Sequence, residues 1–264
     1  MTDKSEQIRR WENEARYFDG LEYDSDKLRP EIVERYMKCE RPYLVEDYEF
    51  VALGDLTGKT VLEVGCGDGW RSIMMAMHGA HVVALDLSSK AIAAARSRAI
   101  KHGLQDQIEF HVSPVEVFNT DQRFDIVSAF ALLHHLIPVL GATLRELKRF
   151  GKPDARYLFV EPISPSRTLR RLRLMMPIAV NGSTDERPLE PAELDTIRAS
   201  FARTKITYYY ALSRISRRVF KGPLETMHPM KRDLYLLAGR VDRFLLQTLR
   251  LHWLASVAFI EAQS

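Results

Sequence analysis

Three closely spaced glycines follow a short apolar run in the first third of the chain. Gly65, Gly67 and Gly69 come directly after Val61-Leu-Glu-Val64. Glycine lets the backbone turn sharply and approach a ligand, and ligands of open α/β sheets bind at the carboxyl ends of the strands. A dinucleotide fingerprint would have its third glycine where this chain has Trp70. The spacing therefore predicts a ligand-binding loop and disfavours a nicotinamide-dependent oxidoreductase, an interpretation that binding of NADH would revive.

Two carboxylates stand close to this loop in the predicted sheet. Glu63 precedes the glycines and suits a ligand with an ammonium group better than one with a pyrophosphate. Asp86 ends the next apolar run, and its two oxygens can accept hydrogen bonds from both hydroxyls of a vicinal diol. Two simpler explanations stay open: a tight turn without a ligand for the glycines, and a favourable charge at a helix N-terminus for Asp86.

The stretch from Glu63 to Gly69 resembles the first motif of class I S-adenosylmethionine-dependent methyltransferases, an acidic residue followed by G-x-G-x-G. The resemblance covers about residues 55–161. It implies that the first two glycines pack against the methionyl and ribosyl portions of S-adenosylmethionine, that Glu63 orients its amino group and that Asp86 bonds its ribose. Many relatives have an acid for the adenine amino group where this chain has Ser113-Pro-Val115, so that contact departs from the family's pattern. The implied cofactor-binding residues are Glu63, Gly65, Cys66, Gly67, Gly69, Asp86, Leu87, Ser113, Val115 and Phe130.

Two histidines follow the fourth apolar run, in a segment similar to the fourth motif of small-molecule methyltransferases. Methyl transfer is an in-line displacement, so the enzyme chiefly has to place a nucleophile opposite the sulfur. A neutral histidine can take the proton of a hydroxyl acceptor. His135 is the first candidate for this base and His134 the second; the alternative is that His135 packs on the cofactor while His134 faces solvent. The Asn/Asp-Pro-Pro-aromatic element of enzymes that methylate bases or glutamine amides is missing here, so we do not expect a nucleic-acid acceptor.

Strands and helices alternate through the centre of the chain. Apolar periodicity and β-branched residues predict strands at 60–64, 81–86, 108–112, 124–128, 155–160, 204–212 and 253–261. Helices are predicted at 4–17, 31–38, 71–78, 90–102 and 138–150, and a mainly helical insertion at 215–250. Ser88 is a candidate N-cap, and Gly103 a helix stop. The pattern predicts an α/β fold with a seven-stranded, mostly parallel sheet, helices on both faces, N-terminal helices and a C-terminal helical cap. We expect a helical lid at 1–54, the S-adenosylmethionine-binding core at 55–163 and a part that completes the sheet at 164–264.

The flanks, which the resemblance does not cover, are expected to select the substrate. Trp11, Tyr17, Phe18 and Tyr23 either lie over the cofactor as a lid or pack as ordinary core. Residues 1–163 carry 21 Lys/Arg and 26 Asp/Glu, whereas residues 164–264 carry 17 and 9. The basic and apolar segment 167–176 has three interpretations: peripheral contact with an anionic membrane that supplies a lipid-like acceptor such as a prenylated quinone, a site for an acceptor's phosphate or carboxylate, or a solvated face.

Composition bounds the remaining possibilities. The 264 residues contain no apolar run of the length of a membrane span, and the polar start lacks the features of a secretory signal, so we expect a cytoplasmic protein. Two isolated cysteines, Cys39 and Cys66, predict neither a disulfide framework nor a metal site. We expect an enzyme that methylates a small molecule, foremost on oxygen, with S-adenosylhomocysteine as product. The alternative from another class is a catalytically silent cofactor-binding subunit that regulates a partner.

Overall fold

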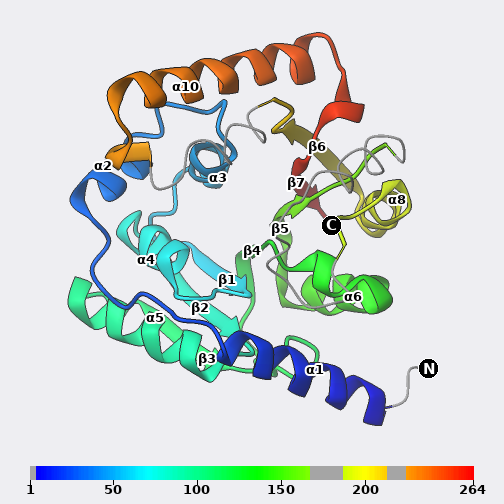
Figure 1. Cartoon of the computed structure of the whole chain (residues 1–264). Coiled ribbons are helices and arrows are strands. Elements are labelled where there is room, and N and C mark those ends of the chain that lie inside the picture. Colours follow the sequence, from blue (N-terminus) through cyan, green and yellow to red (C-terminus); the bar gives the residue numbers. More distant parts are fainter. Residues whose placement is uncertain (1–3, 167–186, 213–223) are drawn as a thin grey trace.

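The computed structural model describes residues 4–166, 187–212 and 224–264, and one seven-stranded sheet lies at its centre (Figure 1). The strand order is β3-β2-β1-β4-β5-β7-β6. The strands are β1 (Thr60–Val64), β2 (His81–Asp86), β3 (Ile108–Val112), β4 (Phe124–Phe130), β5 (Gly151–Pro162), β6 (Arg203–Tyr209) and β7 (Val257–Gln263). β7 runs antiparallel to its neighbours β5 and β6, and the other neighbouring pairs are parallel. The predicted seven-stranded, mostly parallel sheet is confirmed.

Helices cover both faces of this sheet, as predicted (Figure 1). The α-helices of the described residues are α1 (Lys4–Asp19), α2 (Pro30–Lys38), α3 (Val45–Leu53), α4 (Trp70–Met77), α5 (Ser89–His102), α6 (Leu140–Phe150), α8 (Pro191–Ser200) and α10 (Pro229–Arg243). The helices α2 to α5 bury apolar side chains such as Phe50 and Ile73 on one face. On the other face α6 and α8 do the same, with side chains such as Leu144 and Ile197.

The unit formed by β2 and α5 shows how local sequence sets these boundaries. The Ser88 hydroxyl accepts a hydrogen bond from the Ala91 N–H at 3.0 Å and so caps the first turn of α5. Gly103 ends the helix in the left-handed conformation, with φ 70°, which glycine adopts without a steric penalty. Both predicted signals are confirmed.

β6 is shorter than the predicted strand 204–212. It ends at Tyr209 because Tyr210 has a left-handed backbone, with φ 60°. The backbone N–H groups of the next two residues leave the ladder and donate to the buried carboxylate of Asp242 at 3.0 and 2.7 Å. A contact across 30 residues, which no local pattern reveals, therefore sets this strand end.

β7 also starts later than predicted, and two helices, α3 and α8, were not predicted. His252–Leu254 form a 3-10 turn, so the strand occupies Val257–Gln263 instead of 253–261. Of these two, α3 is buried on more than one side and therefore lacks the one-sided apolar stripe of a surface helix. α8 begins at Pro191 behind a capping box of Glu190 and Glu193 that the sequence analysis did not use.

The basic segment 167–176 and the first part of the predicted helical insertion, 215–223, lie outside the described residues. Among the residues that are described, no helix has the length and hydropathy to cross a bilayer. The division into lid, core and C-terminal part stays a prediction, although β6 and β7 do complete the sheet from the last third of the chain.

Candidate functional site

A cavity of about 240 Å³ lies at the carboxyl ends of β1 to β4, and α1 closes one side of it. Its wall contains seven of the predicted site residues: Gly65, Gly67, Asp86, Leu87, Ser113, Val115 and His135. Five others lie outside this wall: Glu63, Cys66, Gly69, Phe130 and His134. Further lining residues that the sequence did not single out for the site include Glu14, Leu21, Glu116, Leu132 and Leu136.

The glycine loop approaches the cavity because its backbone is tied to the neighbouring strand. The N–H groups of Gly65 and Cys66 both donate to the Leu85 carbonyl, at 2.8 and 3.0 Å. Gly65 has φ 77°, and a Cβ atom there would lie 3.1 Å from the Leu132 side chain. Gly69 acts differently, because a Cβ atom there would meet the Cβ atom of Ala95 on α5 at 2.7 Å. The third glycine therefore permits close helix packing, whereas the first leaves room at the cavity.

Asp86 holds the loop and the second strand tip together. One carboxylate oxygen accepts the Gly67 N–H at 2.8 Å, and the other accepts the Ser88 N–H at 2.8 Å. Burial raises the pKa of Asp86, although these backbone hydrogen bonds act against the shift. The N-cap of α5 is Ser88, so Asp86 lies two residues before the cap of that helix. Each carboxylate oxygen keeps acceptor capacity at the cavity wall.

The end of the cavity beside the tips of β2 and β3 is apolar, with polar side chains at its rim. Leu87 and Val115 form walls there. The Ser113 hydroxyl is engaged locally, because it donates to the Pro114 carbonyl at 3.0 Å. Glu116 lines the same end and pairs with Arg10 of α1 at 3.2 Å. A carboxylate is therefore present, three residues later than the position examined in the sequence.

Glu63 lies behind the cavity rather than in its wall. The side chain is buried on the α4 side of β1, and its carboxylate accepts a hydrogen bond from the Ser72 hydroxyl. Burial raises the pKa of Glu63 to about 7 and outweighs the opposing effects of Ser72 and Arg71. Direct contact with a ligand in the cavity is not part of this arrangement.

Cys66 and Phe130 belong to the hydrophobic cluster on the same face of the sheet. Burial raises the pKa of the Cys66 thiol well above its usual value, which keeps it protonated and unreactive. The guanidinium of Arg71 lies 4.8 Å from the centre of the Phe130 ring and pairs with Glu49 at 2.8 Å. The sequence analysis predicted contact of both residues with the cofactor. In the structure their side chains pack in the hydrophobic cluster and lie outside the cavity wall.

The two adjacent histidines point to different surroundings. β4 ends at Phe130, and Leu133–His135 form a single 3-10 turn. His135 lines the cavity, where its ring meets the Phe18 ring edge-on at 5.6 Å between centroids. His134 lies outside the cavity wall, and its Nδ1 atom is 2.8 Å from a carboxylate oxygen of Glu161.

Glu161 is a buried carboxylate that the sequence analysis missed. It ends β5 next to Pro162 and accepts the backbone N–H groups of Leu132, Leu133 and His134 at 2.9, 2.7 and 3.2 Å. With the His134 ring, four donors converge on this one side chain. Its position offered a signal, because a carboxylate at the carboxyl end of a central parallel strand is placed at the ligand-binding edge.

α1 brings aromatic side chains to the cavity. Trp11 and Phe18 of α1 line it together with Tyr23 from the chain after this helix, and Tyr17 packs edge-on against Phe18 with ring centroids 5.2 Å apart. Asp19, the last residue of α1, accepts hydrogen bonds from the Ser88 hydroxyl at 2.7 Å and the Lys90 N–H at 3.1 Å. The helix is therefore attached beside Asp86, where the lid interpretation requires it.

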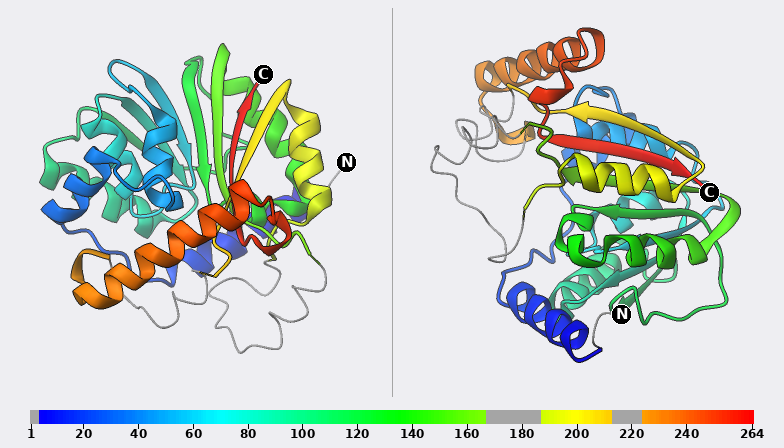
Figure 2. Two further views of the ribbon diagram at one scale, coloured as in Figure 1. Left: turned by 90° about the horizontal axis from the view of Figure 1, so that it is seen from above. Right: turned by 90° about the vertical axis from the view of Figure 1, so that its right-hand side faces the viewer.

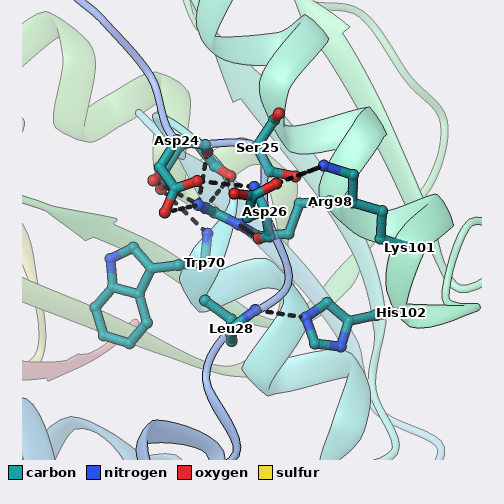
Figure 3. Close-up of polar contacts among 9 residues, drawn as sticks. Asp24, Ser25, Asp26, Leu28, Trp70, Arg98, Lys101 and His102 are labelled. Atoms are coloured by element: carbon teal, nitrogen blue, oxygen red, sulfur yellow. Dashed lines mark hydrogen bonds and ion pairs between the residues drawn. The ribbon is translucent and has the colours of Figure 1, made fainter.

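A buried arginine fixes the chain that follows α1 (Figure 3). Arg98 on α5 donates to the backbone carbonyls of Asp24, Asp26 and Asp68 at 2.6, 2.9 and 2.7 Å. It also pairs with the Asp68 carboxylate at 2.8 Å. Because Asp68 belongs to the glycine loop, one guanidinium joins that loop to the connection between α1 and α2. Neither spacing nor periodicity pointed to this role.

The cavity wall fits an adenosyl amino acid. A carboxylate with free acceptor capacity faces a space without side chains at Gly65 and Gly67, next to apolar walls. A ribose diol, a peptide-like chain and a flat base need these three surroundings. Among the described residues no three His, Cys, Asp or Glu side chains come together in a way that could hold a metal ion.

Comparison with known proteins bears on this fit. A protein-family model described as "Methyltransferase domain" matches residues 55–186. A ubiquinone biosynthesis O-methyltransferase of Psychrobacter cryohalolentis is 30% identical over 204 residues, which are 74% of this chain and 78% of that protein. The protein of the same name from Psychrobacter arcticus is 34% identical over 128 residues, 48% of this chain and 49% of that protein. The chain spans about half the length of the first curated relatives it matches.

Solved structures share the fold along nearly the whole chain. Magnesium protoporphyrin IX methyltransferase from Synechocystis PCC 6803 superposes with a TM-score of 0.54 and 16% identity, covering 97% of both chains. Geranyl diphosphate C-methyltransferase from Streptomyces coelicolor A3(2) gives 0.55 and 16%, covering 96% of this chain and 97% of that one. These identities are low, so the likeness concerns the fold.

Proposed function

Because this chain belongs to the class I S-adenosylmethionine-dependent methyltransferases, we propose that it transfers a methyl group from that donor to an oxygen of a small-molecule acceptor. The observation that carries the proposal is one cavity that joins the glycine loop, the Asp86 carboxylate and the His135 imidazole. The curated relatives are named O-methyltransferases of ubiquinone biosynthesis, which supports oxygen as the accepting atom.

Each part of the donor has matching residues along the cavity. Asp86 accepts the hydroxyl protons of the ribose, Leu87 and Val115 enclose the adenine, and the backbone at Gly65 and Gly67 borders the amino-acid part. The bound donor supplies a methyl group on a positively charged sulfur. Asp86 adds negative charge at the ribose, and Glu116 lies at the end of the cavity where Val115 would enclose the adenine.

His135 is the residue we propose as the general base. Its ring stands in the cavity wall, whereas His134 is engaged by Glu161 outside that wall. A neutral imidazole at this position would take the hydroxyl proton while the acceptor oxygen bonds to the methyl carbon and that carbon's bond to the donor sulfur breaks, so that S-adenosylhomocysteine leaves. The neighbouring Trp11, Phe18 and Leu136 offer aromatic and apolar contact, so we propose a phenol-like ring as the acceptor.

Two measurements test this function. Calorimetry with S-adenosylhomocysteine should detect binding that Asp86→Ala abolishes or weakens strongly, since the ribose loses its acceptor. In a screen of phenols, catechols and hydroquinones, His135→Ala should lower turnover about a hundredfold, and His134→Ala much less. A loss of no more than about threefold in both variants contradicts the base assignment. Product binding without turnover of any acceptor favours the silent regulatory subunit instead.

A further inference from the structure

The helix α10 carries an exposed apolar stripe. Large apolar side chains recur along it at alternating spacings of four and three residues, which places them on one helix face. They are exposed by 37% to 73%, far more than core side chains. The stripe consists of Met230, Leu234, Leu237, Val241 and Phe244, the last in a π-helical turn, Phe244–Thr248, that continues α10.

The opposite face fixes the helix to the protein, so the stripe cannot turn inward. Tyr235, Gly239 and Asp242 are the buried residues of α10. A Cβ atom at Gly239 would lie 3.0 Å from the side chain of Leu44, which shows how closely the helix packs there. Asp242 accepts two backbone hydrogen bonds from the chain after β6.

Positive charge exceeds negative charge along the helix that carries the stripe. Residues 229–250 contain five Lys/Arg and two Asp. One of the acids, Asp242, is buried, and the other, Asp233, lies 3.9 Å from Arg232. The basic residues are Lys231, Arg232, Arg240, Arg243 and Arg250. Farther along, the half-exposed Leu249 and Trp253 add apolar surface.

The stripe lies at the edge of the sheet where the candidate site opens. β6 runs parallel to β5 and ends at Tyr209, and β7 begins at Val257 at the same edge, so the connection with α10 belongs to the carboxyl ends of the parallel strands. Figure 2 shows α10 and α1 at this common edge, α10 near β6 and α1 near β3.

We propose that α10 docks flat on an anionic lipid bilayer, with its apolar stripe in the interface and its cations at the headgroups. Helices that lie in a bilayer surface combine these features: Lys and Arg on the polar side, and Leu, Phe or Trp on the other. A second copy of this chain fits less well, because pairing two such helices would bring like charges together along the seam. The proposal does not depend on the proposed methyl transfer.

Vesicle sedimentation tests the docking directly. The full chain is mixed with vesicles of phosphatidylcholine alone, or of phosphatidylcholine and phosphatidylglycerol in equal parts, at low salt. We expect binding to the anionic vesicles only, weakened by added salt because the attraction is screened. Leu234→Glu/Leu237→Glu should reduce the bound fraction at least about tenfold, and Lys231→Gln/Arg243→Gln about tenfold as well.

Matched controls separate docking from general effects. Ile100→Glu changes an equally exposed apolar residue on α5, and Lys59→Gln/Arg123→Gln removes two cations near the amino ends of β1 and β4. Both should bind vesicles like the unchanged chain. Calorimetry with S-adenosylhomocysteine verifies that every variant keeps its binding site. The vesicle test can therefore be interpreted even if no methyl acceptor is found.

Three results would overturn the proposal. The first is no sedimentation of the unchanged chain with anionic vesicles at low salt. The second is equal losses in the stripe variants and their controls. The third is a dimer in solution that Leu234→Glu/Leu237→Glu disperses without changing vesicle binding, which would assign the stripe to a second copy.

Discussion

Glu161 gives the segment after β4 its shape, and through that segment the position of His135. Its oxygens accept from three consecutive backbone N–H groups and from the His134 ring. A buried N–H group without an acceptor destabilises the fold by the full free energy of removing that group from water. Glu161 is therefore a positioning residue, which reaches the cavity only through the turn that it holds.

Glu161→Gln should destabilise the fold and slow turnover together. The amide nitrogen of glutamine cannot accept a hydrogen bond, so at least one backbone N–H group loses its partner. We expect urea titration to show a free energy of unfolding lower by about 2–4 kcal/mol. His134→Ala removes one donor and leaves the backbone contacts in place, so it should cost distinctly less. Equal unfolding midpoints for Glu161→Gln and the unchanged chain would contradict this role.

Glu63 makes stability depend on pH. Its pKa is raised from 4.5 to about 7 by burial, so the folded chain holds a proton that the unfolded chain has already released in that interval. The stabilisation by the protonated form is complete below the unfolded pKa and is lost as pH rises through about 7. Between these limits the free energy of unfolding should fall by up to about 3 kcal/mol.

Glu63→Gln should remove that part of the pH dependence, because an amide does not ionise. Urea titrations on both sides of the interval measure it, and Glu109→Gln on the exposed surface of β3 is the matched control. The same slope in Glu63→Gln and the control would show that Glu63 ionises normally.

At the scale of elements, α5 holds together three parts of the site. The cap residue at its N-terminus donates to Asp19 of α1, and Arg98 donates to carbonyls of the connection between α1 and α2 and of the glycine loop. Arg98 is 2% exposed. If its guanidinium were lost, water could not easily reach these carbonyls to donate hydrogen bonds in its place.

Arg98→Lys should therefore cost stability although the charge is kept. A lysine ammonium lacks the planar fork that reaches three carbonyls at once. We expect a free energy of unfolding lower by about 2–4 kcal/mol and weaker binding of S-adenosylhomocysteine, as its loop loses support. Arg96→Lys on the same helix is the control, since Arg96 is exposed and, within the described part of the chain, donates to one carbonyl, that of Phe110. Similar losses in both variants would count against the clamp.

The sequence predicted those elements whose signals are local. β1, β2 and β3 have the predicted bounds, because each is a short apolar run with a turn or cap beside it. β6 and β7 differ at their ends, where Asp242 and a 3-10 turn decide the boundary. Helices α3 and α8 were both missed, and for α3 the reason is that burial on several sides leaves no one-sided pattern.

The same distinction explains the site. Gly65, Gly67 and Asp86 follow strands directly, so their types and spacing indicated a cavity that the structure contains. Glu161, Asp19 and Arg98 act on residues that are 27 to 74 positions away in the chain. Their importance depends on how the elements pack, which one sequence does not encode in any spacing.

For the whole molecule, the site consists of strand tips on one side and α1 on the other. Asp19 and the Arg10–Glu116 pair attach α1 to β-strand ends that themselves line the cavity. Trp11, Phe18 and Tyr23 of this N-terminal region face the same space. A ligand that fills it must therefore bury contacts with both sides at once, and binding should stabilise them as one unit.

Hydrogen exchange with and without S-adenosylhomocysteine measures that coupling. At a ligand concentration about a hundredfold above its Kd, protection should rise by up to about 2.7 kcal/mol for amides that exchange through opening of the site. We expect this rise in α1 and at the tips of β1 and β2. The helices α8 and α10 do not line the cavity and should change little below global unfolding. In Asp86→Ala the ribose has no acceptor, so added S-adenosylhomocysteine should no longer raise protection in α1 or at the strand tips. Protection confined to the strand tips would mean that α1 is not part of the binding site, and the aromatic side chains would then be ordinary packing.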